Sequence, residues 1–475
     1  MSRTDVTVFA VALFLAAPAR AADKFNDLLK DLPPSVNAVI ICDVQSIYGS
    51  PLATKGKWAA SSAAGFPAGI QQVVLGTKID PHSLRPTATE YGVAYLKVRL
   101  TMDDLTVREM GARDTIVNAP AVLSPRNAYF IELRPWTIGM VAPANRQEAA
   151  QFVRFVRNSP GVKLSPFLTA ALVNVDAKTQ FVLAHDLADA IHPEQVRAKI
   201  AKSKALAGKQ VNIDALTKLL TSLQGLRLEV RIADDIRGEL RVMFDQDVTP
   251  FAALAGPIFH DVLAERGAAV DEVADWTAEA AGNTVVFRGP LTEKSFRRIA
   301  TLIQPPPPAV GTGEEPQLAA DLKRHASLHF VTMVTTYLAD LHKPTRQAKK
   351  SYENYALWYE TFAQKVGQLP QYNVDEDVLK YGYGVSERLR AIAGSLRGDV
   401  VDVNALEKKI SFGVSAGAYF GAPSLWVQTN QGQIRQMQQD VIDRSEQTRQ
   451  EILKTIDAET AAIQAKMAQK YPTNP

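Results

Sequence analysis

One short motif in the C-terminal half could place a nucleophile. Residues 413–417 read Gly-Val-Ser-Ala-Gly, the G-x-S-x-G pattern that presents the serine of α/β-hydrolases on a sharp turn after a strand. Those enzymes place the acid and then the histidine after the serine, but the last histidine of this chain is His342. Because no histidine follows Ser415, the ordered triad cannot be completed. We interpret residues 410–420 as a β-prone stretch punctuated by glycine.

A second constellation has the spacing of a metal site. His325 and His329 lie four residues apart on a predicted helix, and Asp321 lies one turn earlier, so the three side chains share one face. Two histidines at i and i+4 are a common zinc pair. The glutamate of the H-E-x-x-H pattern is absent, since position 326 is alanine, and no further ligand pattern is evident. A metal-binding module at these residues is one alternative; a helix-packing or solvated pair is the other.

Two further groupings fit turns better than binding sites. Residues 185–192 contain two histidines and two aspartates, at the end of an apolar run where a turn or a helix cap is expected. Asn373, Asp375 and Asp377 imitate the opening of a calcium loop, but its central glycine and closing glutamate are missing. The sequence contains no phosphate-binding loop and no dinucleotide fingerprint, so it predicts no cofactor and no catalytic residue.

The elements that would carry these residues follow a weak internal repeat. Apolar runs at 39–44 and 182–187 are predicted to be strands, and each ends in an aspartate followed by an apolar residue. An acidic pair between alternating stretches occurs at 103–104 and again at 234–235, where period-two alternation predicts a hairpin with one buried face.

The third landmark is the strongest. Strands predicted at 138–143 and 285–290 each end in proline, and an amphipathic helix follows each of them. The apolar positions of the two helices, which include Val153 and Ala300, match at an offset of 147. Three landmarks in the same order, at offsets of 131 to 147, are consistent with a duplication.

These patterns predict an α+β fold. Two tandem, duplicated sheet-plus-helix units would occupy residues 22–160 and 161–304. Four consecutive prolines open a predicted linker at 305–317. A mainly helical region would follow at 318–427.

The chain would end in a long helix within 428–475, because residues 433–470 contain neither proline nor glycine. Such a helix spans more than about 50 Å. Ile452, Ile456, Ile463 and Met467 lead its apolar stripe, in which an 11-residue spacing suits a nearly straight coil. The stripe could pack on the body of its own chain or on a partner, so a coiled coil with another copy or with an envelope protein is one of two expectations.

The N-terminus has the features of an export signal. Arg3 precedes an apolar run at 6–17, and Ala19-Arg20-Ala21 fits the small-x-small cleavage pattern, so residues 1–21 are expected to be removed. No later segment reaches transmembrane length. A net charge of +3 over 475 residues argues against nucleic-acid binding. The one cysteine, Cys42, lies in a predicted buried strand and is expected to be a structural thiol.

Both ends of the chain resemble exported bacterial proteins of no assigned function. The resemblance rests on residues 33–40 and 50–53 near the start, and on 456–460 and 467–471 near the end. It implies an envelope or secreted location and no catalytic residue.

The leading hypothesis is therefore an exported, non-enzymatic scaffold or binding module, periplasmic or secreted. An extracytoplasmic hydrolase with its site between the two α+β units is the main alternative. The metal-binding module at Asp321, His325 and His329 is the other.

Overall fold

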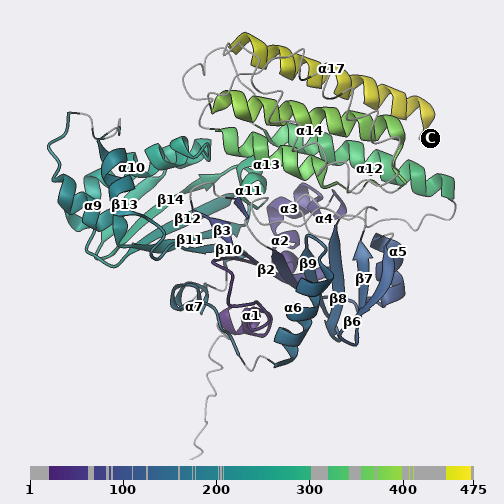
Figure 1. Cartoon of the computed structure of the whole chain (residues 1–475), viewed down its shortest axis with the longest axis horizontal. Helices are drawn as coiled ribbons and strands as arrows, with labels where there is room; N and C mark the ends of the chain where they lie inside the picture. The colour runs from purple at the N-terminus through teal and green to yellow at the C-terminus, as the bar shows by residue number, and fades with distance from the viewer. Residues whose placement is uncertain are drawn as a thin grey trace, which may run out of the picture.

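The computed structural model describes most of residues 21–471 (Figure 1). The longer gaps are residues 62–68, 301–318, 342–354 and 398–445, and within the last only Leu406 and Ile410 are described. Three sequence predictions therefore fall outside the described residues. They concern the signal peptide up to residue 20, the linker at 305–317 and Ser415.

An antiparallel sheet of 12 strands forms the centre of the molecule, in the order β13-β14-β12-β11-β10-β1-β2-β5-β9-β8-β7-β6. A two-stranded ribbon of β3 and β4 stands apart from it. The α+β class expected from the sequence is thus confirmed, with both predicted units contributing to one continuous sheet. The strands are β1 (Ala38–Cys42), β2 (Ile70–Thr77), β3 (Ile79–Asp80), β4 (Arg85–Pro86), β5 (Glu90–Leu96), β6 (Ala112–Ile116), β7 (Ala119–Ser124), β8 (Ala128–Arg134), β9 (Thr137–Ala142), β10 (Phe181–Asp186), β11 (Leu223–Ile232), β12 (Ile236–Phe244), β13 (Thr277–Ala281) and β14 (Thr284–Leu291).

The sheet consists of two halves with the same strand order, joined where β1 pairs with β10. From this seam outward, β1-β2-β5-β9-β8 in the first half corresponds to β10-β11-β12-β14-β13 in the second. The register preserves the correspondence across every strand. One ladder row of the first half joins Val39, Gly76, Tyr91, Val141 and Tyr129, and its counterpart joins Val182, Glu229, Glu239, Arg288 and Thr277.

Two of the three sequence landmarks occupy matching places in this arrangement. The first landmark is β1 and β10, and the third is β9 and β14, in the same ladder rows. The acidic-pair landmark is wrong. Asp234 and Asp235 form the turn between β11 and β12, whereas Asp103 and Asp104 lie in helix α5 (Met102–Glu109), beyond β5. Thr101 accepts a hydrogen bond from the Asp104 N–H at 3.1 Å, so this acidic pair begins a helix.

The two faces of the sheet are covered by different helices. We call the face that carries Ile40, Leu75 and Leu183 the inner face, and the face that carries Val39 and Val182 the outer face. The outer face packs against α1 (Ala21–Leu29), α6 (Arg146–Asn158) and α7 (Pro166–Val173). The inner face packs against α2 (Val44–Tyr48), α3 (Pro51–Lys55), α4 (Trp58–Ser61), α5, α8 (Pro193–Ile200), α9 (Ile213–Thr221), α10 (Ala252–Glu265) and α11 (Glu293–Ala300).

The two helices of the third landmark pack on opposite faces of the sheet. In α6, Phe152 and Val153 are buried with Val141 on the outer face. In α11, Phe296 packs edge-on against Phe181 on the inner face, with ring centroids 5.4 Å apart. Val153 and Ala300 are both buried, as the repeat predicts, but the helices leave their matching strands in different directions.

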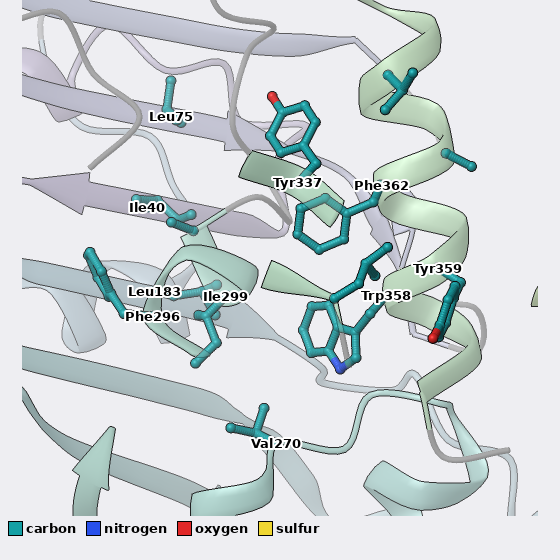
Figure 2. Packing of buried hydrophobic residues seen from close by; sticks show 14 of the residues in the cluster. Ile40, Leu75, Leu183, Val270, Phe296, Ile299, Tyr337, Trp358, Tyr359 and Phe362 are labelled. Atoms are coloured by element: carbon teal, nitrogen blue, oxygen red, sulfur yellow. The ribbon is translucent and has the colours of Figure 1, made fainter. Parts of the chain in front are cut away.

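A layer of four helices closes the inner face (Figure 1). It comprises α12 (Ala319–Asp340), α13 (Ala356–Gly367), α14 (Glu376–Leu396) and α17 (Glu446–Lys470). Figure 2 shows Trp358 and Phe362 of α13 directed toward the sheet residues Ile40 and Leu183. Trp358 and Phe362 are therefore core residues, and the mainly helical character predicted for this region holds in its described residues.

The final helix packs against its own chain. Ile452, Ile456, Ile463 and Met467 are buried, with exposed fractions of 6% or less, where α17 lies along α14 and α12. Arg388 donates to Glu459 at 2.7 Å across this contact. The apolar stripe predicted from the sequence is thus covered within the chain. Among the described residues, no helix is long and apolar enough to cross a membrane.

Candidate interaction surface

The seam between the two halves is apolar. The five residues of β1 and the first five of β10 are all buried and pair directly as neighbouring strands, and His185 is the one ionisable side chain of this pairing apart from Cys42. The hydrolase alternative places its site between the two units, where β1 and β10 pair as neighbouring strands of one sheet. Cys42, at the end of β1, is fully buried, and burial holds the pKa of its thiol well above the ordinary value. It is a structural thiol, as expected.

The predicted metal-binding residues lie on α12. His325 and His329 are half-buried, and the side chain of Asp321 is outside the described residues. Within the described part of the chain, no group of three or more His, Cys, Asp or Glu side chains has the arrangement of a metal site. The metal-binding alternative gains no support and stays a prediction.

The other polar groupings serve as caps and core residues. Asp186 accepts a hydrogen bond from the Ala188 N–H at 3.0 Å, and His192 caps α8 by accepting from the Glu194 N–H. Burial lowers the pKa of His185 to about 4, so this imidazole is neutral at pH 7. Asp375, in the stretch that imitates the opening of a calcium loop, caps α14.

The feature with the clearest capacity for recognition is the outer face of the second half. In the first half, the outer positions Gly76, Tyr91 and Val141 are covered by helices; in the second half, Glu229, Glu239 and Arg288 occupy the matching positions. The apolar cluster of the outer face includes no side chain from β11, β12, β13 or β14. We call this surface the open face, and Figure 1 shows α1 and α7 lying below the sheet nearer the seam.

Ion pairs run across the open face from strand to strand. Arg288 Nε donates to Glu239 at 2.7 Å, and Arg288 Nη1 donates to Glu279 at 2.7 Å. Arg241 Nε donates to the other oxygen of Glu239, also at 2.7 Å. Partial burial acts to raise the pKa of Glu239, but the hydrogen bonds and charges of Arg288 and Arg241 together lower it. The Glu239 carboxylate is therefore ionised at neutral pH.

The ladder is least exposed beside α7. Arg227 and Glu229 form an ion pair of 2.7 Å, with both side chains about one-tenth exposed. Thr179 donates a hydrogen bond to Glu229 at 3.0 Å. Burial lowers the pKa of Arg227, although Glu229 opposes this shift. The pair fixes one margin of the open face through short, directional contacts.

The charges of the open face balance. Odd-numbered residues of β11 and β12 project from the same side of the sheet, because side chains alternate along a strand. Five arginines meet five acids on this surface and its rim: Arg227, Arg231, Arg237, Arg241 and Arg288 with Asp176, Glu229, Asp235, Glu239 and Glu279. The balance disfavours a polyanion as the ligand and suits a partner of mixed charge.

Sequence reasoning missed this surface, although its signal was present. The alternation of Leu226, Leu228, Val230 and Ile232 identified the buried side of β11. The intervening residues carry the complementary pattern of charges, which becomes a surface only when β12 and β14 lie beside it.

Comparisons with known proteins give no family. No family model matches the chain, and no curated protein matches it. Crystal form I of TP0453, a Treponema protein, is similar at 10% identity and a TM-score of 0.34, over 58% of this chain and 96% of that one. Crystal form IV of the same protein is similar at 10% identity and a TM-score of 0.33, over 60% and 99%. A likeness at these values supports no argument about function.

Proposed function

We propose that this chain is an exported, non-enzymatic binding module of the cell envelope or the secreted fraction, and that it binds a protein partner through the open face. The observation that carries the proposal is the contrast between matching positions. Where the first half buries its outer face under α1 and α6, the second half carries α7 only beside β10 and β11 and presents an array of paired charges beyond it. Export rests on the pattern of residues 1–21 in the sequence.

The open face suits recognition more than catalysis. An antiparallel sheet can expose one face to water, so exposure alone is ordinary. Here, however, the strand ladder and the ion pairs hold Glu239, Arg241 and Arg288 in fixed relative positions. Preorganised charges of both signs favour a complementary partner and reject one of a single sign. The apolar seam supports the same choice, since a hydrolase site between the halves would need a polar cleft.

Site-specific photo-crosslinking in the native host tests the proposal. A crosslinking residue at Arg237, on the rim of the open face, should give a discrete larger species that mass spectrometry identifies. The same residue at Val107, which is exposed on α5, serves as the control and should give none. Arg288→Glu should abolish the species, because it reverses the charge that Glu239 and Glu279 contact. Equal crosslinking from both positions, or none from Arg237, would refute the proposal.

A further inference from the structure

The sheet ends at β13, and the far edge of this strand has no partner strand among the described residues. In the first half, the corresponding strand β8 is followed by β7, with Val122 opposite Phe130. All residues of β13 except Ala280 are exposed. The strand also lacks the proline, lysine or bulge with which proteins commonly protect an edge.

The ladder determines which backbone groups point to this edge. The Phe244 N–H donates to the Asn283 carbonyl oxygen at 2.9 Å, so Phe244 directs its backbone groups toward β14. Backbone direction alternates along a strand, so Leu240 also faces β14. Its register partner Phe287 therefore faces β12.

The next residue of β14, Arg288, consequently faces β13 and bonds with its register partner Thr277. By the same alternation, Glu279 also directs its backbone groups into the sheet. The amide and carbonyl groups of Ala278 and Ala280 then point to the open edge. Two N–H donors and two carbonyl acceptors therefore lie along this edge, at the spacing of a strand ladder.

The side chains around this edge differ on the two faces. On the inner face, Ala278 lies under α10, and a β-carbon built on Gly256 would be 3.9 Å from it. Ala278 and Ala280 carry small apolar side chains on this face, beside which larger apolar side chains of an added strand would lie. On the outer face, Glu279 is about two-thirds exposed and contacts Arg288 on its β14 side. A basic side chain on the edge side of Glu279 would continue the charge alternation of the open face.

We propose that β13 is a strand-addition site for an extended peptide segment of a partner protein. The side chains of this segment that lie on the inner face would be large and apolar. Those that lie on the outer face would be Lys, Arg or Thr. This inference rests on the proposed function and names the chemistry of the partner. A foreign chain fits better than a second copy, because antiparallel pairing of β13 with itself would bring Glu279 close to its own counterpart.

Labelled peptides test the site on the full chain. The probe is Thr-Val-Lys-Phe-Lys-Val-Thr with blocked termini, and the comparison peptide carries Glu in place of Lys. Fluorescence anisotropy at low salt should show binding of the lysine peptide at least about tenfold tighter. N-methylation of Val and Phe should abolish binding, because their N–H groups would face Ala278 and Ala280. N-methylation of the Lys residues should be tolerated. Equal effects of the two N-methylated sets would overturn strand addition.

Protein variants give an independent result. Ala280→Pro removes an outward N–H and should weaken binding by at least about tenfold, whereas Ala280→Ser keeps that group and a small side chain and should bind within about twofold of the unaltered chain. Glu279→Lys should reverse the preference between the two peptides. Hydrogen exchange over residues 277–281 should slow when the lysine peptide binds. If sedimentation instead shows a dimer that Ala280→Pro abolishes, the occupant is a second copy and the foreign peptide is refuted.

The two proposals can fail separately. Loss of peptide binding with retained crosslinking from Arg237 would remove strand addition and leave the open face as the binding surface. Loss of crosslinking from Arg237 with retained specific peptide binding would remove the open face as the binding surface and leave strand addition at β13.

Discussion

The packing of α17 leads to a quantitative prediction about Ile456. This side chain is about 1% exposed, between α17 and the helices beneath it. Ile456→Ala removes three buried carbons, worth about 0.8 kcal/mol each on transfer to water. With the remaining cavity, the free energy of unfolding should fall by about 2–5 kcal/mol. Taking about 2.1 cal/mol/K of unfolding entropy per residue, a 475-residue chain that unfolds as one unit should lose about 2–5 °C in Tm.

Thermal unfolding and light scattering together check this reasoning. Gln464→Ala is the matched control, because Gln464 is exposed on the same helix and its removal should leave Tm within about 1 °C. The solution mass should be the same for all three proteins, since the apolar stripe is covered within the chain. If Ile456→Ala instead lowered the mass while Tm stayed constant, α17 would join separate chains and the reasoning would fail.

Three further predictions concern a thiol, a carboxylate and the N-terminus. Cys42 should react with a thiol reagent at pH 8 only after denaturation, because burial raises the pKa of its thiol and excludes the reagent; fast reaction of the folded protein would contradict its buried place. The pKa of Asp375 is lowered because the Lys470 ammonium and the Asp377 N–H outweigh the effect of burial, so the contribution of this carboxylate to stability should be present at pH 7 and disappear as pH falls below about 4. Asp375→Asn should therefore lower Tm at pH 7 and lower it by less at pH 3, and an equal loss at both values would exclude the charge as the cause. Mass spectrometry of protein from the native host should find a mature start at Ala22; a soluble cytoplasmic form that keeps Met1 would refute export.

Local pattern predicted most of the elements that position the surface. Buried alternation identified β11 and β12, and an apolar run closed by proline, with a helix beyond it, identified β9 and β14. These signals are local, because the period of side-chain burial is set by the strand or helix itself. The prediction that both acidic pairs lie in hairpin turns was wrong for the same reason. Asp-Asp suits both a hairpin turn and the first turn of a helix, and only the register distinguishes Asp234 from Asp103.

The single sheet could not be predicted in this way. Pairing of β1 with β10 brings together residues about 143 apart in the sequence, such as Ile40 and Leu183. Both strands are buried on both faces, so each reads equally well as the centre of its own sheet. The place of the open face in the sheet depends on this pairing and on the four further pairings that join β10, β11, β12, β14 and β13. Its residues were therefore missed, although each appears in the sequence as an ordinary exposed charge.

The two halves share one strand register, but different residue types occupy the matching positions on their outer faces. This difference explains why helices cover the outer face of the first half and leave that of the second half open. On the inner face, the matching positions Met140 and Phe287 are both apolar, so both halves bury this side. On the outer face, Val141 corresponds to Arg288, and a helix placed there would bury a charge that Glu239 and Glu279 now hold in water. Helix α11 accordingly returns to the inner face, and the second half keeps its outer strands and the β13 edge accessible. The same strand register thus supports a half whose outer face is covered by helices and a half whose outer face carries paired charges.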